Sequence, residues 1–298
     1  MHRSPLQIGT DYYGGGPAIR LFRWGLGASQ RLWPALAVRA ACRLFGTPLP
    51  PRWWWRGQPW GDGWRREPWP FEQASLTLYS RPIAPHGPVA LLVHGWGGHA
   101  GQLRALAEAV AARGLRPVVL EMPGHGASAG TVSNLPQFAR AIDYATARLS
   151  QQGHRVHALI AHSMGANAAA YAVSRGLPVA RLVLIAPPAS PREFTRMFAQ
   201  VFGLDESTRA ALQQRVEARE GVLMPQFEPA AVGPRVALTT LVVHDRGDRT
   251  NRFADGEAYV QSIAQARLLA TDGLGHRRVL KDPFVLGAVG DFVAPPTP

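Results

Sequence analysis

The chain has 298 residues, which is enough for one large α/β domain with an additional segment and too few for three domains. Hydrophobic residues make up 46% and charged residues 17%, a globular composition that excludes wholesale disorder. The formal net charge is +12, and Lys281 is the only lysine among the 32 basic residues. A single cysteine, Cys42, excludes an intrachain disulfide and a thiolate metal cluster.

The N-terminal part of the sequence is strongly basic, because residues 1–87 hold 11 arginines and 4 acidic residues. Residues 1–17 are typical of a frayed end, and the spacing predicts a basic helix over about 18–46. Residues 50–70 contain six of the nine tryptophans, together with arginines and prolines. We interpret residues 1–73 as an arm that wraps a domain and buries its indoles, since a soluble protein does not easily expose so much aromatic surface.

The first 35 residues contain arginines and no apolar run of signal-peptide length. No stretch approaches the roughly 18 apolar residues that a transmembrane helix needs. The sequence alone therefore leads us to expect a soluble, cytoplasmic protein.

After residue 73, short apolar runs alternate with helical periodicity, which predicts an α/β fold with a mostly parallel sheet and helices on both faces. The predicted strands are 75–80, 89–93, 117–120, 156–160, 181–185, 236–243 and 266–270. The predicted helices are 102–113, 135–149, 164–173, 254–263 and 284–292.

Residues 190–232 interrupt this alternation, because they contain no predicted strand. Phe194, Phe198 and Phe202 recur at four-residue steps, which predicts one helix. A second helix follows, with Asp205 as its N-terminal cap. We interpret this interval as a two-helix insertion over the sheet edge.

The candidate nucleophile is Ser163, within Ala161-His162-Ser163-Met164-Gly165. This segment joins a predicted strand to an alanine-rich helix. A serine on such a sharp turn is pushed out of the sheet with its hydroxyl exposed, and small residues two positions before and after it allow the turn. The alternative is a buried serine that caps the helix.

A glycine-rich loop, His94-Gly95-Trp96-Gly97-Gly98, follows the buried strand 89–93. Glycines free the backbone to direct N–H groups at a ligand, and acyl transfer needs two such donors where the carbonyl oxygen becomes negative. We predict that the backbone N–H groups of Trp96 and Met164 form this oxyanion hole. His94 is predicted to have a structural role.

Two aspartates follow the strand predicted at 236–243, and one of them could orient a histidine. Asp245 comes directly after the strand and is predicted to hold the turn, whereas Asp248 lies further into the loop and is the better candidate. His276 stands on a glycine-rich loop before the last helix. The chain order is then Ser163, Asp248, His276, as in the triad of α/β-hydrolases.

Five segments together resemble the α/β-hydrolase superfamily over about residues 74–293: LLVHGWGG, VVLEMPGHGAS, ALIAHSMGANAAA, VVHDRGDR and GLGHRRVL. The sequence looks like the bacterial members with an HGWGG loop and a GHRR histidine loop. It departs from the usual pattern at Ala161, at Ala166, where a second glycine is common, and at Glu121, where aspartate often ends the strand.

The resemblance implies an α/β-hydrolase core of residues 74–189 and 233–298. The insertion at 190–232 stands where the superfamily carries a cap, between the sixth and seventh strands. No metal or organic cofactor is implied. Relatives with haloalkane dehalogenase or epoxide hydrolase chemistry carry aspartate where Ser163 stands, which disfavours those reactions.

The predicted function is hydrolysis of small-molecule carboxylic esters of short to medium acyl chain, through an acyl-enzyme. Thioester, lactone or C–C bond hydrolysis and acyl transfer use the same triad and stay open. We predict that Phe194, Phe198 and Phe202 line the substrate pocket. The alternative is that they fasten the cap to the core.

A function of another class is a membrane-surface binding module, with residues 18–69 as its working part and peripheral membrane contact through the N-terminal arm. Nucleic-acid binding is disfavoured, because there is no lysine cluster and no recognised binding motif. The sequence does not predict the oligomeric state.

Overall fold

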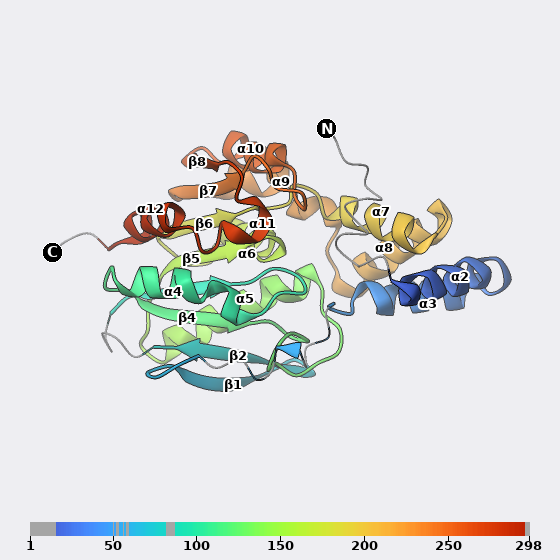
Figure 1. Ribbon diagram of the computed structural model, residues 1–298, viewed down its shortest axis with the longest axis horizontal. Helices are drawn as coiled ribbons and strands as arrows, with labels where there is room; N and C mark the ends of the chain where they lie inside the picture. Colours follow the sequence, from blue (N-terminus) through green and yellow to red (C-terminus); the bar gives the residue numbers. More distant parts are fainter. Residues whose placement is uncertain are drawn as a thin grey trace. The chain divides into compact units, whose positions relative to one another are not determined.

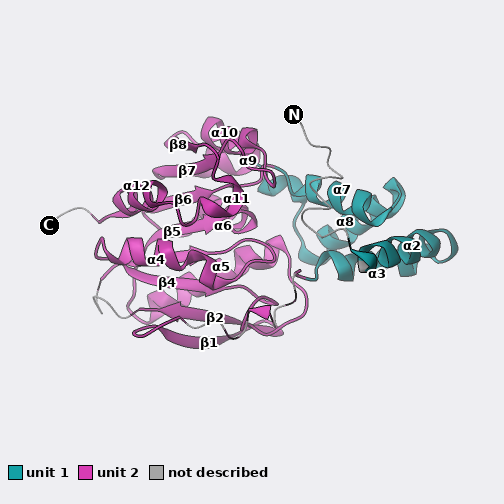
Figure 2. Ribbon diagram, in the orientation of Figure 1, with its two compact units in different colours: residues 1–47, 190–228 teal, residues 48–189, 229–298 magenta. Residues whose placement is uncertain are grey.

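The computed structural model describes residues 16–49, 51, 54–55, 57, 60–81 and 87–295. It divides the chain into two compact units, coloured separately in Figure 2. The helical unit comprises residues 1–47 and 190–228, and the α/β unit comprises residues 48–189 and 229–298. The predicted frayed end lies outside the described residues, except for its last two positions, and so do parts of the tryptophan-rich segment.

Eight strands of the α/β unit form one sheet in the order β1-β2-β4-β3-β5-β6-β7-β8 (Figure 1). The strands are β1 (Arg65–Phe71), β2 (Ala74–Ser80), β3 (Val89–Val93), β4 (Arg116–Glu121), β5 (Val156–His162), β6 (Arg181–Ile185), β7 (Thr240–Asp245) and β8 (Ala266–Thr271). The pairs β1–β2 and β2–β4 are antiparallel, and the other pairs are parallel. The predicted α/β fold with a mostly parallel sheet is confirmed.

The helices of this unit alternate with the strands. They are α4 (Arg104–Ala111), α5 (Leu135–Gln151), α6 (Met164–Ser174), α9 (Pro229–Val232), α10 (Phe253–Ser262), α11 (Gly275–Arg278) and α12 (Pro283–Val293), with the short 3-10 turns η2 (Ala100–Leu103) and η4 (Gly233–Arg235). Side chains of α4 and α12 share one buried cluster with alternate residues of β3 and β5. Because helices cover the sheet, β3 can be apolar at every position, and all five of its residues are buried.

The sequence predicts no strand at residues 65–71, where the structure has β1. Pro68 and Pro70 argue against a strand, because proline cannot donate a hydrogen bond to a neighbour. β1 is the edge of the sheet, however, and pairs only with β2. The two prolines are two residues apart, so both ring nitrogens can face the open edge, while Trp69 and Phe71 are buried.

The tryptophan-rich segment packs in part against the α/β unit. The Trp60 ring stacks on the Tyr79 ring at 4.2 Å between centroids, and Trp60 and Trp64 lie against the buried cluster of this unit. Trp69 is 1% exposed, whereas Trp54 is 57% exposed. The residues between 54 and 71 that the structure describes therefore belong to the α/β unit rather than to a separate arm.

The helical unit contains α2 (Pro17–Leu32), α3 (Pro34–Phe45), α7 (Pro191–Phe202), α8 (Glu206–Glu220) and the 3-10 turn η3 (Met224–Phe227). The single helix predicted over 18–46 is two helices, because Pro34 disfavours the helical conformation at the residue before it, and Trp33 has φ −142°. The two helices predicted in the insertion are confirmed. Asp205 accepts from the Thr208 N–H at the start of α8, and Gly221 ends it in the left-handed conformation.

Segments far apart in the sequence pair in this unit. Helix α2 packs against α7, and α3 packs against α8. The Gln30 carboxamide donates to the Gly203 carbonyl at 3.1 Å and accepts from the Asp205 N–H at 3.0 Å. The structure thus differs from the predicted division, in which residues 1–73 form one arm and residues 190–232 a separate cap.

Phe198 and Phe202 form the centre of the helical unit. Both side chains are 0% exposed and share a buried cluster with Leu26, Ala41 and Leu212. A fully buried side chain offers no surface to a ligand, so the structure gives these two residues a packing role in place of the predicted pocket role. They fasten the helices of this unit to one another.

We expect Phe198→Ala to lower the free energy of unfolding of the helical unit by about 3–5 kcal/mol, because removal of a buried ring leaves a cavity. Denaturant unfolding followed by circular dichroism measures this loss. Phe284→Ala is the matched control, since that side chain is 66% exposed, and we expect it to change the stability by less than about 0.5 kcal/mol. Equal stabilities of the two variants would contradict the packing role.

Candidate active site

Ser163 occupies a strained turn between β5 and α6, with φ 54° and ψ −127°. Such a conformation costs a non-glycine residue about 1–3 kcal/mol and persists only where surrounding contacts impose it. Two glycines allow the backbone of the two segments to approach this closely. A Cβ on Gly165 would lie 2.4 Å from the His94 carbonyl oxygen, and a Cβ on Gly95 would lie 2.7 Å from the Ser163 Cβ. The serine turn and the loop after β3 therefore fit against each other only with glycine at both positions.

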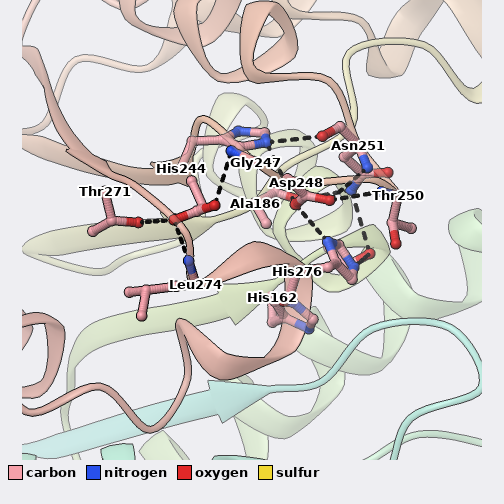
Figure 3. A network of polar contacts seen from close by, with 12 residues as sticks. His162, Ala186, His244, Gly247, Asp248, Thr250, Asn251, Thr271, Leu274 and His276 are labelled. Carbon is pink, nitrogen blue, oxygen red and sulfur yellow. Dashed lines mark hydrogen bonds and ion pairs between the residues drawn. The ribbon is translucent and has the colours of Figure 1, made fainter. Parts of the chain in front are cut away.

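The structure brings the three predicted triad residues together in one series of hydrogen bonds. Figure 3 labels two of them, Asp248 and His276. His276 Nε2 lies 3.1 Å from Ser163 Oγ, and His276 Nδ1 lies 2.7 Å from Asp248 Oδ2. In the tautomer that satisfies both contacts, Nδ1–H donates to the carboxylate and Nε2 accepts the serine hydroxyl. This places an unprotonated ring nitrogen beside the serine.

The Asp248 carboxylate is buried and well supplied with donors. Its Oδ1 accepts from the backbone N–H groups of Thr250 at 2.7 Å and Asn251 at 3.0 Å. Burial by itself would raise the pKa of Asp248, but the hydrogen bond from His276 and the backbone donors hold it below its ordinary value. Asp248 is thus kept ionised where it faces the His276 ring.

Asp245 has the structural role that the sequence predicts. Its Oδ1 accepts from the Gly247 N–H, and its Oδ2 accepts from the Thr271 hydroxyl at 2.8 Å and the Leu274 N–H at 2.9 Å. Figure 3 labels these three partners. This carboxylate ties the loop after β7 to the loop after β8. It thereby fixes the separation between the loops that carry Asp248 and His276.

Two further residues at the site have no predicted role. Asn251 Nδ2 donates to the Ala186 carbonyl at 2.7 Å and lies 3.5 Å from Ser163 Oγ. His162 Nε2–H donates to the backbone carbonyl of His276 at 2.9 Å. No sequence pattern distinguishes either residue, because each contact joins segments that are far apart in the chain.

The loop after β3 is held by two neutral histidines. His94 Nδ1–H donates to the Gly95 carbonyl, and Nε2 accepts from the Met122 N–H at 3.1 Å. His125 accepts from the Gly97 N–H at 3.1 Å. Burial lowers the pKa of His94 well below its ordinary value and that of His125 to about 4, so both rings stay neutral and can accept. The structural role predicted for His94 is confirmed.

Two backbone donors of the same loop are bound within the chain. The Gly97 N–H is taken by His125, and the Gly98 N–H donates to the Gly95 carbonyl at 3.1 Å. Within the described part of the chain, the Trp96 N–H has no acceptor, and neither does the Met164 N–H at the start of α6. These are the two N–H groups that the sequence predicts for an oxyanion hole, and that role stays a prediction.

Glu121, a departure from the usual aspartate, joins the loops after β3 and β4. Its carboxylate accepts from the N–H groups of Ala100 at 3.0 Å and Ala127 at 2.7 Å, and from the Tyr79 hydroxyl. Burial raises the pKa of this carboxyl against the opposing effect of these donors. The position of Gly126 leaves no room for a side chain, since a Cβ there would lie 2.0 Å from Glu121 Oε1.

The remaining predicted site residues lie elsewhere. Phe194, Phe198 and Phe202 belong to helix α7 of the helical unit, where Phe194 is half-buried. A pocket role for Phe194 stays a prediction. Among the described residues, no group of three or more histidine, cysteine, aspartate or glutamate side chains is placed to hold a metal ion.

Comparisons with known proteins find similar proteins for much of this chain. The family model described as serine aminopeptidase, S33, a hydrolase family, matches residues 84–221. No curated protein matches the sequence.

Solved structures share the fold. Est1E from Butyrivibrio proteoclasticus with ferulic acid bound is 19% identical with a TM-score of 0.62, and the match covers 76% of this chain and 97% of that chain. An esterase from Pyrococcus furiosus is 15% identical with a TM-score of 0.58, covering 77% of this chain and 91% of that one. A membrane phospholipase A described as a bacterial virulence factor is 18% identical with a TM-score of 0.56, covering 89% and 94%.

The chain therefore has the fold of these α/β-hydrolases, and residues 84–221 match the model of a hydrolase family.

We expect Gly95→Ala to slow labelling of Ser163 by a fluorophosphonate probe by roughly 100-fold or more, because the new methyl group must displace the serine by a fraction of an ångström or more. Intact mass spectrometry over time measures the rate. Gly287→Ala is the matched control, since a Cβ there meets nothing within 4 Å. Equal labelling rates for the two variants would show that the serine turn does not depend on this close approach.

The buried neutral histidines predict a loss of stability in mild acid. Burial lowers the pKa of His125 to about 4, whereas an unfolded histidine titrates near 6.5. Between these values the unfolded state binds a proton that the folded state excludes, so the free energy of unfolding falls as the pH drops from about 7 to about 5. His125 alone should account for about 2 kcal/mol of that fall.

Urea unfolding of the wild type and of His125→Gln, each at both pH values, isolates this effect. We expect the difference in unfolding free energy between the two pH values to shrink by about 2 kcal/mol in the variant. An unchanged pH dependence would contradict the neutral, acceptor role of His125.

Proposed function

We propose that this protein hydrolyses carboxylic esters through a Ser163–His276–Asp248 triad. The observation that supports the proposal most is the single hydrogen-bond series from Asp248 Oδ2 through the His276 ring to Ser163 Oγ, with contacts of 2.7 Å and 3.1 Å. A serine hydroxyl is a weak nucleophile unless an adjacent base accepts its proton. His276 is in position to be that base.

In the proposed acylation step, His276 Nε2 takes the Ser163 proton as Oγ attacks the ester carbonyl carbon. The carbonyl oxygen becomes negative and accepts from the N–H groups of Met164 and Trp96. Asp248 stabilises the imidazolium through the Nδ1–H bond. The C–O bond to the alcohol then breaks, and the departing oxygen takes the proton from Nε2.

Deacylation repeats the sequence with water in place of the alcohol. His276 Nε2 takes a proton from water, which attacks the acyl-serine, and the carboxylic acid leaves as Ser163 recovers its proton. The strained turn at Ser163 supports this role, because it presents the hydroxyl at the end of β5 rather than burying it in α6.

The substrate class rests on two kinds of support. The arrangement suits acyl transfer to water, and the structurally similar protein from Pyrococcus furiosus is an esterase. Within the ester class we propose short to medium acyl chains. Thioesters, lactones, C–C bonds and acyl acceptors other than water use the same triad, and the test therefore includes one thioester and one lactone.

Treatment with a fluorophosphonate probe tests the nucleophile. We expect one adduct on the wild type and none on Ser163→Ala, because the probe reacts with an activated serine. A panel of p-nitrophenyl esters of increasing acyl length, with one thioester and one lactone, then tests the substrate class. No adduct on a folded wild type, or an adduct on the variant, would overturn the assignment of Ser163; labelling without turnover of any ester would overturn the substrate class.

A further inference from the structure

Helix α2 carries apolar side chains on two opposite faces. Leu26 faces inward, is 6% exposed, and packs in the buried cluster with Phe198 and Phe202. On the opposite face, Leu21, Trp24 and Leu32 recur at three- and eight-residue steps and are 70%, 75% and 65% exposed. A helix with 3.6 residues per turn places these three on one stripe.

Exposed apolar side chains also occur at the break between the two helices and just after it. Trp33, at the break, is 62% exposed, and Leu36, in the first turn of α3, is 57% exposed. Phe22 of α2 is 51% exposed as well. Single exposed apolar residues are ordinary, but six large ones on two short helices and the break between them mark a surface for a partner. The outer face of α2 and α3 is defined here as Leu21, Trp24, Leu32, Trp33 and Leu36.

The charge on these helices has one sign. Helices α2 and α3 contain five arginines and no acidic residue. Arg23 is exposed and reaches across to α7, where it donates to the carbonyls of Gln200 and Val201. The other four arginines are exposed, and none of them lies within salt-bridge distance of a carboxylate of the described residues: Arg20, Arg31, Arg39 and Arg43.

The two helices packed beneath them differ in composition. Helices α7 and α8 mix arginines with glutamates, and several of these form ion pairs, such as Arg196 with Glu193 and Arg209 with Glu206. Helices α7 and α8 together carry five arginines and four glutamates, whereas α2 and α3, which expose the apolar side chains, carry five arginines and no acidic residue. Helices α2 and α3 lie side by side in the helical unit (Figures 1 and 2).

We propose that the outer face of α2 and α3 binds the surface of a membrane that contains anionic lipids. Tryptophan and arginine favour the boundary between headgroups and acyl chains, leucine enters the acyl region, and arginine pairs with lipid phosphate. The helices lie in the plane of the surface. None of the helices in the described ranges is long and apolar enough to cross a bilayer.

The charge pattern favours lipid over a second copy of the chain. In a two-fold symmetric dimer the same patch meets itself, so arginines of one copy would face arginines of the other. An anionic bilayer instead offers a phosphate to each exposed arginine. Self-association is therefore an outcome of the test rather than part of the proposal.

Co-sedimentation of the full chain with vesicles tests the proposal. We expect binding to vesicles of phosphatidylcholine mixed with phosphatidylglycerol, and much weaker binding to phosphatidylcholine alone. Binding should weaken as salt is raised, because salt screens the attraction between arginine and phosphate. Absence of binding to the mixed vesicles at low salt would overturn the proposal.

Two double variants separate the contribution of the tryptophans to membrane binding from that of the arginines. Trp24→Ser with Trp33→Ser should weaken binding to the mixed vesicles about tenfold or more, and so should Arg20→Gln with Arg39→Gln. Leu223→Ser with Phe284→Ser is the matched apolar control, since both side chains are exposed and lie outside the outer face. Arg104→Gln with Arg113→Gln removes the same charge from the α/β unit.

The outcomes are distinguishable. Equal loss of binding in the variants and in their controls would show that net charge or general hydrophobicity is responsible, and would overturn the proposal. Analytical ultracentrifugation without lipid tests self-association. If the wild type is a dimer that binds no vesicles, and Trp24→Ser with Trp33→Ser converts it to a monomer, this face serves self-association and the proposal is overturned. Denaturant unfolding followed by circular dichroism, the measurement used for Phe198→Ala, reports whether each variant keeps its fold.

Discussion

The close contact between the serine turn and the loop after β3 is the constraint on which the site depends. Ser163 has a backbone conformation that is unfavourable for a residue with a side chain, and the neighbouring chain leaves it no alternative. Gly95 and Gly165 make this contact possible, because a methyl group at either position would overlap the serine or the His94 carbonyl. The strain is therefore maintained by packing, and its consequence is a hydroxyl that points out from the end of the sheet toward His276.

Polar groups buried beside that turn hold the surrounding loops in place. Glu121 gathers backbone donors from the loops after β3 and β4, and Asp245 does the same for the loops after β7 and β8. The buried histidines hold the loop after β3 as well. Burial keeps them neutral, so one ring nitrogen accepts a hydrogen bond while the other donates one. Each of these groups would be costly to bury alone, and each is satisfied by backbone atoms of a loop that carries a proposed catalytic group.

The apolar side chains of the helical unit fall into two groups, one buried in its core and one exposed. Phe198, Phe202 and Leu26 build a core from helices that are widely separated in the sequence, and this core explains why the N-terminal helices associate with the insertion. The opposite stripe of α2 contributes nothing to that core. Its combination of exposed tryptophan and leucine with unpaired arginine is the chemistry of a surface that meets both acyl chains and phosphate, which is the basis for the proposed membrane contact.

The sequence by itself determined the alternation of strands and helices, the turn at Ser163 and the chain order of the three residues in the hydrogen-bond series. Each of these features can be predicted from a short stretch of sequence, because periodicity, glycine spacing and strand ends are local properties. Tertiary structure alone decided that Pro68 and Pro70 fit an edge strand, that Asn251 lies beside Ser163, and that Phe198 and Phe202 are buried. Each of these depends on which distant segment packs against the residue, and a local pattern contains no information about its neighbours in space.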